Sequence, residues 1–434
     1  MKRVMIVFLM AGTAVGQWTP PVFLDSSAHG PCKFAQGPSG HEWVGYIDKR
    51  SDPPMLRIRH LPDSSYYDVD SVGVWSDDVA LVMSAGLPHA FYVRRNPMNP
   101  ASGTIFLAKF TGRQWLIEAI DSLHNEYGTL LAAHSSGDTL WVLYHQQWPV
   151  GGTFVTLIQA SKVGSGPWTY DTVISSTSDH FEPIATIGSE VMFYHFVGQF
   201  KNHPTPEDHP LWSQNLCLAR KEGHLWVVDT VNVGVDLVFA VYDATKWFAV
   251  FQDEGWWNLT LMKGNFGGWE TIVLDTGKII SSPKIDVWQG RPYILSVEPK
   301  ERAAAPPWFL TFRGANWPMG QVELVDSCEQ VCSHGMSIRV LPDGRIAVVA
   351  ALWRRNGRCD EVRYSVREAL SIKEQEGNLV TRAGRAATIG RQFGRPAHDI
   401  KFFDVTGRLV RPTRPGIYHC LEKGEIPRRV VFIR

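Results

Sequence analysis

Short apolar runs alternate with turn residues along most of the chain. From residue 18 to about 366, strand-like runs rich in Val, Ile, Leu, Tyr and Trp end at turns that contain Gly, Pro or Asp. Short strands separated by turn signals about every ten residues are typical of an all-β fold. The pattern therefore predicts an all-β architecture for the body of the chain.

Two kinds of predicted hairpin alternate in this region. In the first, a Gly turn precedes a Trp and a strand that ends near Asp or Ser, and five stretches share it: 110–115, 164–168, 221–226, 264–269 and 312–317. The second has apolar residues in both strands, as expected for buried strands, and it recurs at 32–46, 79–92, 130–144, 184–194, 237–251, 284–297 and 337–350. Together, two hairpins make a unit of four antiparallel strands, a to d.

The count of units follows from the residue that opens each d strand. These residues are Trp18, Tyr66, Trp115, Trp168, Trp226, Trp269 and Trp317. Residues 18–25 look like a d strand that no a, b or c strand precedes, whereas the last unit ends at a c strand near 359–366. We therefore expect a seven-bladed β-propeller over residues 17–370, closed by the N-terminal strand, because closure removes exposed sheet edges.

Repeats of about fifty residues with a Trp in each unit resemble the sialidase-like propellers. The resemblance covers roughly residues 18–370 and implies the fold only. Sialidases carry an Asp box, Ser-x-Asp-x-Gly-x-x-Trp, and no unit of this chain has one intact. We interpret the repeated Trp as blade-to-blade packing; a row of sugar-stacking platforms is the alternative.

Both ends of the chain suggest export. Lys2 and Arg3 precede an apolar run over 4–10 and small residues at 14–16, so residues 1–16 are predicted to be a signal peptide. No later run is long and apolar enough to span a bilayer. Six Cys in an exported chain are compatible with disulfides or with buried thiols.

The last part of the chain departs from the repeat. Residues 371–397 are rich in charge and Gly and are predicted to be a linker; residues 398–434 are strand-like again. Asp404-Val-Thr-Gly407, Pro415-Gly-Ile-Tyr418, Gly424 and the final Val430–Arg434 resemble the type A C-terminal sorting domain of the type IX secretion system. That family implies a small C-terminal β-sandwich, the type IX secretion machinery as partner, and a secreted or outer-surface location reached via the periplasm.

Polar residues gather in the loops that a propeller presents at one face. The residues we single out as ligand-binding candidates are His29, His124, His180, Asp236 and His334 in d-to-a loops, and Arg94, Asp253 and Arg354 in b-to-c loops. His145 and His195 also lie in b-to-c loops. Equal numbers of basic and acidic residues, 43 each, give no electrostatic reason to expect nucleic acid.

Three interpretations of this face compete: solvated loops, a binding face, and a catalytic pocket. His and carboxylates could bind hydroxyls while Trp148, Trp256 and Trp257 stack on sugars or an aromatic partner. No spaced metal motif, Gly-x-Ser-x-Gly or phosphate-binding loop occurs, so we predict no metal and no cofactor. We predict a secreted or surface binding module for a glycan or protein ligand; the alternative is a sialidase-like glycan hydrolase or lyase using the axial pocket.

Overall fold

The structure is a computed structural model, and its description covers the strands and most turns of the body and four short strands of the tail. The described residues are 18–25, 32–37, 40–48, 51–61, 65–72, 79–96, 98–124, 130–148, 154–177, 179–197, 213–233, 235–253, 258–276, 281–299, 308–314, 322–328, 330–354, 358–367, 400–403, 409–410, 416–422 and 428–432. The predicted signal peptide and linker lie outside them. Contact clustering divides the chain into two units, of which residues 18–368 form one.

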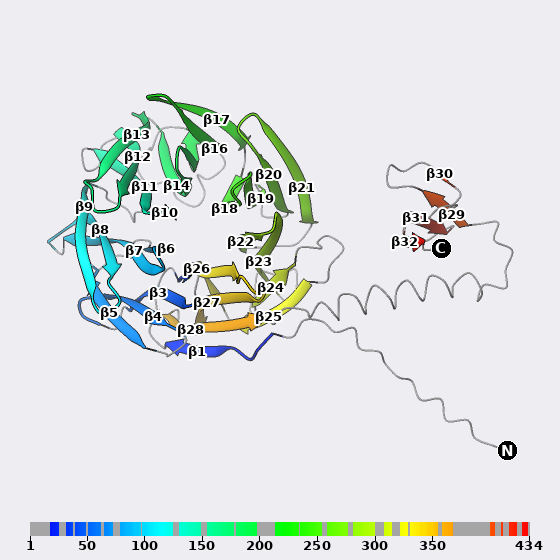
Figure 1. The fold of residues 1–434 in the computed structure, drawn as a ribbon, viewed down its shortest axis with the longest axis horizontal. Helices are drawn as coiled ribbons and strands as arrows, with labels where there is room; N and C mark the ends of the chain where they lie inside the picture. The colour runs from blue at the N-terminus through cyan, green and yellow to red at the C-terminus, as the bar shows by residue number, and fades with distance from the viewer. Residues whose placement is uncertain are drawn as a thin grey trace, which may run out of the picture. The chain divides into compact units, whose positions relative to one another are not determined.

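Seven four-stranded antiparallel sheets form a ring in this unit (Figure 1). The first three are β2 (Lys33–Gln36), β3 (Glu42–Asp48), β4 (Met55–His60), β5 (Tyr66–Ser71); β6 (Val79–Ser84), β7 (Leu87–Asn96), β8 (Asn99–Phe110), β9 (Trp115–His124); and β10 (Ala132–Ser136), β11 (Thr139–Trp148), β12 (Phe154–Val163), β13 (Thr169–Ser176). The next two are β14 (His180–Ile187), β15 (Glu190–Val197), β16 (Ser213–Glu222), β17 (Leu225–Val233); and β18 (Val235–Tyr242), β19 (Trp247–Asp253), β20 (Asn258–Asn265), β21 (Gly268–Thr276).

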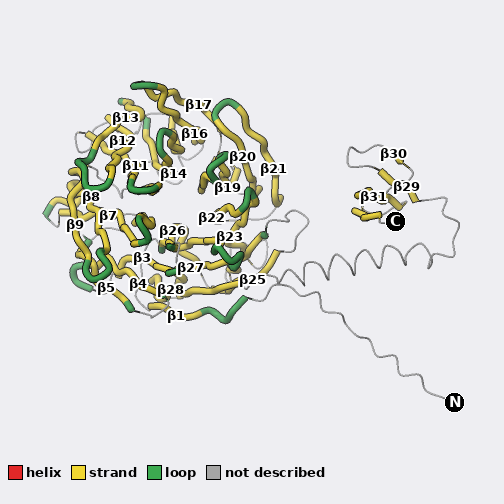
Figure 2. The backbone as a smooth tube through the Cα atoms, viewed as in Figure 1, coloured by secondary structure: helices red, strands yellow, loops and turns green. Residues whose placement is uncertain are grey.

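The last two sheets complete the ring. They are β22 (Ser281–Trp288), β23 (Arg291–Pro299), β24 (Trp308–Arg313), β25 (Val322–Cys328); and β26 (Gln330–Val340), β27 (Ile346–Arg354), β28 (Arg358–Arg367), β1 (Val22–Asp25). We number these sheets blades 1 to 7. In each blade the a strand is innermost and the d strand outermost (Figure 1). None of the described residues is helical (Figure 2), so the all-β seven-bladed propeller predicted from the sequence is confirmed.

The N-terminal strand β1 belongs to blade 7. It pairs antiparallel with β28, with Val22 opposite Tyr364 and Phe23 opposite Arg363. Trp18 forms an isolated bridge with Arg367 just before this strand. The hydroxyl of Tyr46 in blade 1 donates a hydrogen bond of 2.7 Å to Asp25. The two ends of the repeat region therefore meet in one sheet.

The hydrophobic core lies between the blades. One cluster joins Leu143 and Leu157 of blade 3 to Phe181 and Phe193 of blade 4, and the other clusters likewise combine residues of neighbouring blades. The side chain that opens a d strand packs in the same spaces. The Trp168 indole donates to Glu118 of the preceding blade at 2.9 Å, and Trp226 packs on the cluster between blades 3 and 4. These contacts agree with the interpretation of the repeated Trp as blade packing.

Tight hairpin turns set the register of the blades. Gly137 and Gly188 adopt positive φ angles of 59° and 54° at the a-to-b turns of blades 3 and 4, a conformation that costs glycine little. Within the part of the chain that the structure describes, no helix is long and apolar enough to cross a membrane.

The second unit includes the C-terminal tail. Its described strands, β29 (Ile400–Phe403), β30 (Leu409–Val410), β31 (Gly416–Glu422) and β32 (Arg428–Phe432), form one antiparallel sheet in the order β30-β29-β31-β32. The second layer that a β-sandwich requires is not among the described residues of the tail.

Candidate functional site

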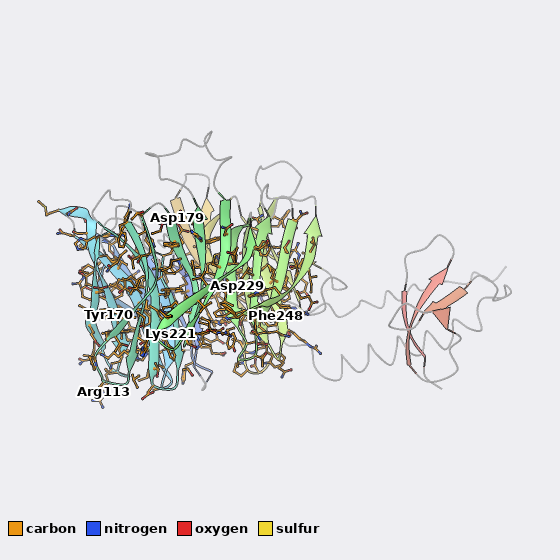
Figure 3. All side chains as sticks on the ribbon, turned by 90° about the horizontal axis from the view of Figure 1, so that it is seen from above. Arg113, Tyr170, Asp179, Lys221, Asp229 and Phe248 are labelled. Carbon is orange, nitrogen blue, oxygen red and sulfur yellow. The ribbon has the colours of Figure 1, made fainter. Side chains whose placement is uncertain are left out.

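The propeller has two faces that differ in the loops they carry. Because alternate strands of an antiparallel sheet run in the same direction, all b and d strands end at one face. We call this the d–a face, and the opposite one, which carries the a-to-b and c-to-d turns, the a–b face. Figure 3 shows Asp179 at the d–a face and Arg113, in a c-to-d turn, at the opposite end of the strands.

The candidate residues predicted from the sequence lie at the d–a ends of several strands. Those with a backbone placed in strands are Arg94 in β7, His124 in β9, His180 in β14, Asp236 in β18, Asp253 in β19, His334 in β26 and Arg354 in β27. The structure does not describe His29. It describes only the backbone, and not the side chains, of Asp236, Asp253, His334, Arg354 and Trp148. Their part in binding stays a prediction.

Three histidines and two carboxylates lie in two groups at the d–a ends of blades 3 and 4. The His145 and His180 rings are 4.9 Å apart, centroid to centroid, and nearly perpendicular. His180 Nε2 lies 3.3 Å from Glu182 Oε1, and His195 Nε2 lies 3.1 Å from Asp179 Oδ2. We call these five residues the histidine cluster.

Strand β14 and its partner position the cluster. His180 and Glu182 are two residues apart and so lie on one side of β14, while Phe181 lies on the other. Phe181 is opposite His195 in β15, and the two rings are 5.1 Å apart. His195 therefore lies on the side of the sheet away from His180 and Glu182. Ser176 donates to Asp179 at 3.0 Å and so holds the start of the strand. The geometry therefore presents both carboxylates beside imidazoles.

Four of the five side chains are partly open to solvent, and His145 is buried. The side chains of His180 and Glu182 are 13% and 31% exposed, and those of His195 and Asp179 are each 21% exposed. Burial lowers the pKa of His145 well below its usual range, and the neighbouring His180 and Arg95 lower it further. His145 is therefore a neutral imidazole at neutral pH.

The cluster combines the polar groups that bind a polyhydroxylated ligand. Carboxylates accept hydrogen bonds from hydroxyls, and neutral imidazoles can donate through one nitrogen and accept through the other. The Phe196 ring, 5.6 Å from that of His180, adds an apolar surface. An apolar surface beside a few polar groups, as at His180, Glu182 and Phe196, is typical of small-ligand sites.

Arg94, by contrast, is engaged between blades 1 and 2. Its guanidinium forms an ion pair with Asp70 of blade 1 and lies over the Phe106 ring at 4.4 Å. Tyr92 donates to the same carboxylate. Arg94 is 39% exposed, so it could still meet a ligand, but its present partners make it an inter-blade tie.

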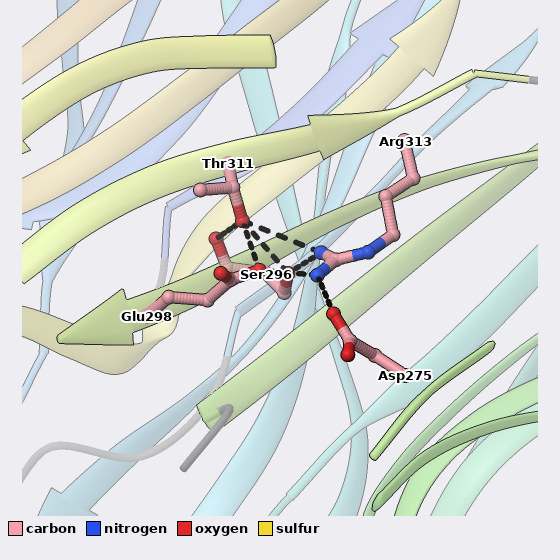
Figure 4. A network of polar contacts seen from close by, with 5 residues as sticks. All are labelled: Asp275, Ser296, Glu298, Thr311 and Arg313. Atoms are coloured by element: carbon pink, nitrogen blue, oxygen red, sulfur yellow. Dashed lines mark hydrogen bonds and ion pairs between the residues drawn. The ribbon is translucent and has the colours of Figure 1, made fainter. Parts of the chain in front are cut away.

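A second polar network lies between blades 5 and 6 on the d–a side (Figure 4), and the side chains of Arg313, Glu298 and Asp275 in it are 0%, 12% and 14% exposed. The fully buried Arg313 donates to Ser296 at 2.6 Å and to Asp275 of blade 5 at 3.0 Å, and it also pairs with Glu298. Thr311 donates to Glu298 at 2.9 Å. Because buried charges are stable only when paired, this network is structural.

Across the described ranges, no group of three or more His, Cys, Asp or Glu side chains is placed to hold a metal ion. Cys217 is a buried thiol, and burial raises its pKa to about 11, which makes it a poor nucleophile at neutral pH.

Of these five residues, only His180 was predicted from the sequence to bind a ligand. His145 and His195 were predicted only to lie in b-to-c loops, and neither Asp179 nor Glu182 was predicted to bind. The available signal was the dipeptide Asp179-His180 followed by Glu182 at the start of an a strand. The distance between His180 and His145, however, depends on how blade 4 packs on blade 3.

Comparisons with known proteins find likeness in structure alone. No protein-family model matches the chain, and no curated protein is similar to it in sequence. The Penicillium chrysogenum alpha-L-arabinanase is 14% identical, with a TM-score of 0.46 over 82% of this chain and 100% of that one. The Trypanosoma rangeli sialidase is 9% identical, with a TM-score of 0.43 over 94% of this chain and 68% of that one. The GH93 alpha-L-arabinofuranosidase of Fusarium graminearum is 9% identical, with a TM-score of 0.46 over 80% of this chain and 97% of that one. The structural neighbours of this propeller thus include sialidases and arabinofuranosidases, and the likeness concerns the fold.

Proposed function

We propose that the propeller is a binding module whose ligand site on the d–a face includes the histidine cluster. The observation that carries the proposal is the contact of His180 with both His145 and Glu182, partly open to solvent, with the His195–Asp179 pair at the same end of blade 4. Side chains that order each other in this way are positioned before a ligand arrives, which lowers the entropy cost of binding.

The ligand class that fits best is a glycan. Vicinal hydroxyls of a sugar can donate to a carboxylate while they accept from imidazole N–H groups. The predicted candidates His124, Asp236, Asp253, His334 and Arg354 come from the same face and would extend the site toward other blades. A protein ligand with Ser- and Thr-rich loops is the other kind of partner this chemistry could serve.

Binding to an array of bacterial and host glycans tests the proposal. The wild-type chain should bind one class of oligosaccharide, and Glu182→Gln and His180→Ala should each weaken that binding about tenfold or more, by loss of a charge-assisted contact of about 1.5–3 kcal/mol. Glu222→Gln is the matched control, because Glu222 is an exposed carboxylate in the same blade. Equal loss in the control, or no loss in the cluster variants, would contradict the site.

One observation favours a glycan-active hydrolase as a second candidate. Asp179 and Glu182 are two partly exposed carboxylates in one short segment, and most glycosidases use a pair of carboxyl groups. If this candidate is right, the bound oligosaccharide should give new reducing ends over time, and both Asp179→Asn and Glu182→Gln should abolish them. Binding without any new reducing ends supports the binding module.

We also propose that β1 serves as the closing strand of the ring. The pairing with β28 would join the two ends of the repeat region, because β1 would supply the fourth, outer strand of blade 7. Closure of this kind makes the stability of each blade depend on the whole ring.

Export and sorting complete the proposal. Residues 1–16 would direct secretion, and residues 398–434 would engage the type IX secretion machinery, so that the propeller reaches the outer surface or the medium. A fusion of residues 371–434 behind a signal peptide and a neutral reporter tests this in a host with that machinery. Delivery that disappears when Val430–Arg434 are removed supports sorting; a reporter that stays periplasmic contradicts it.

A further inference from the structure

A pair of histidines at the a–b face of blade 1 is not used by the proposed function. His41 Nδ1 and His60 Nε2 are 3.0 Å apart, and the ring centroids are separated by 5.1 Å. His41 is exposed, whereas His60 is only 9% exposed. One imidazole of the pair is thus exposed to solvent, and the other is buried in the protein.

The backbone fixes both members of the pair. His41 follows Gly40, which has a φ of 78°, in the turn between β2 and β3, and its carbonyl accepts from the Gly37 amide at 2.9 Å. His60 ends β4 opposite Trp43, whose ring packs against it at a tilt of 32°, with the centroids 4.4 Å apart. Because Trp43 is itself buried, the His60 ring has little freedom to turn away.

The separation of the two nitrogens matches that of two ligands on one metal ion. Nitrogens bound at about 2.0–2.1 Å and about 90° apart lie about 2.9 Å from each other, whereas tetrahedral ligands lie about 3.4 Å apart. A right angle between nitrogen ligands is the preference of square-planar or tetragonal Cu(II) and Ni(II). A modest rotation of the exposed His41 ring would direct both lone pairs at one ion.

We propose that His41 and His60 form a binding site for a tetragonal divalent transition metal, with Cu(II) preferred. Water would fill the remaining coordination positions, since the described residues offer no third His, Cys, Asp or Glu placed to complete a metal-binding group. The bound ion would cross-link the a-to-b turn of blade 1, through His41, to the end of its c strand, through His60. Because only the folded chain brings the two imidazoles together, binding would stabilise the fold by mass action.

The proposal is tested by titrating the full chain with Cu(II) in the presence of a weak competing chelator, followed by electron paramagnetic resonance. One equivalent should bind ahead of all others, with hyperfine splitting from two nitrogens. His41→Ala should lose this equivalent or weaken it roughly tenfold or more, because one of two protein ligands is removed. The residue is exposed in a turn, so the variant should fold like the wild type by circular dichroism.

The matched control is His224→Ala, which removes an exposed histidine from the turn after β16 in blade 4. It should leave the first equivalent and its two-nitrogen signal unchanged. The melting temperature should rise with Cu(II) in the wild type and the control but not in His41→Ala. Equal Cu(II) affinity in His41→Ala and wild type, or a first equivalent with a single nitrogen, would show that the pair is only a hydrogen bond and overturn the site.

Discussion

At the scale of single residues, buried polar side chains join neighbouring blades. Tyr46, Tyr92 and Tyr144 occupy the same place in the b strands of blades 1 to 3, and each donates to a d-strand aspartate of the preceding blade. Burial raises the pKa of all three phenols, and the aspartates raise it further. The hydroxyls therefore remain protonated donors at any physiological pH.

Tyr144→Phe tests the value of one such bond. The Tyr144 hydroxyl donates to Asp121 at 2.6 Å, and its loss leaves Asp121 with Gln146 at 2.9 Å as a partner. We expect the free energy of unfolding, measured by urea denaturation, to fall by about 1–3 kcal/mol. Tyr66→Phe is the control, because Tyr66 is 60% exposed and should change stability by less than about 0.5 kcal/mol.

Buried histidines should make the fold sensitive to acid. Burial lowers the pKa of His89, His134 and His145, so below about pH 6.5 the unfolded chain binds protons that the native chain does not. The free energy of unfolding should therefore be constant above that pH and fall below it. Each such histidine contributes about 1.4 kcal/mol per pH unit until its native pKa is reached.

The variant His145→Asn isolates one contribution to this pH dependence. Denaturation curves at pH 7.5, 6.5 and 5.5 should show a smaller loss of stability on acidification than in wild type. His224→Asn, at an exposed position, should keep the wild-type slope. An unchanged slope in His145→Asn would mean that the residue is already protonated in the native state.

At the scale of the element, a shift of register recurs in the outer strand of each blade. The pairing of strands c and d skips one apolar residue, such as Leu24, Val69 or Ile120. The residue after it is an aspartate in five of the seven blades: Asp25, Asp70, Asp121, Asp275 and Asp326. A bulge re-aims the side chain beside it, which explains how these aspartates reach the next blade.

The Gly264–Trp269 hairpin of blade 5 gives a sharp test at this scale. A Cβ on Gly264 would lie 2.2 Å from the Gly268 carbonyl oxygen, whereas a Cβ on Gly268 would meet nothing within 4 Å. Gly264→Ala should therefore cost about 1–3 kcal/mol of stability through overpacking, and Gly268→Ala should stay within about 0.5 kcal/mol. Equal melting temperatures for the two variants would contradict the described turn.

Much of the fold could be predicted because turns and strand-opening aromatics mark the repeat locally. The d strands expected at Tyr66, Trp115, Trp168, Trp226 and Trp269 lie within one residue of β5, β9, β13, β17 and β21. The site was harder to predict. The distance from His145 to His180 depends on packing between two blades, and nothing in the turn pattern determines that packing. The apolar residue followed by Asp at 24–25 and 69–70 is a local sequence signal for the hydrogen bonds that these aspartates make to the next blade.

At the scale of the whole molecule, the proposed closure makes the ring depend on β1, which pairs with β28. Deleting residues 18–25 would remove the partner of β28, the Tyr46–Asp25 bond and the contact of Trp18 with Glu323 at 3.1 Å. We expect a melting temperature lower by 10 °C or more, on the order of several kcal/mol, with aggregation through the exposed edge. Deleting residues 1–17 alone should leave the melting temperature unchanged, and a stable 18–25 deletion would contradict ring closure.

The most direct test of the account is a crystal structure of the full chain soaked with the oligosaccharide that binds best on the array. The account predicts ligand density on the d–a face within hydrogen-bond distance of His180 and Glu182, between blades 3 and 4. Density confined to the a–b face, to the outer d strands or to another blade junction would contradict the histidine cluster as the binding site.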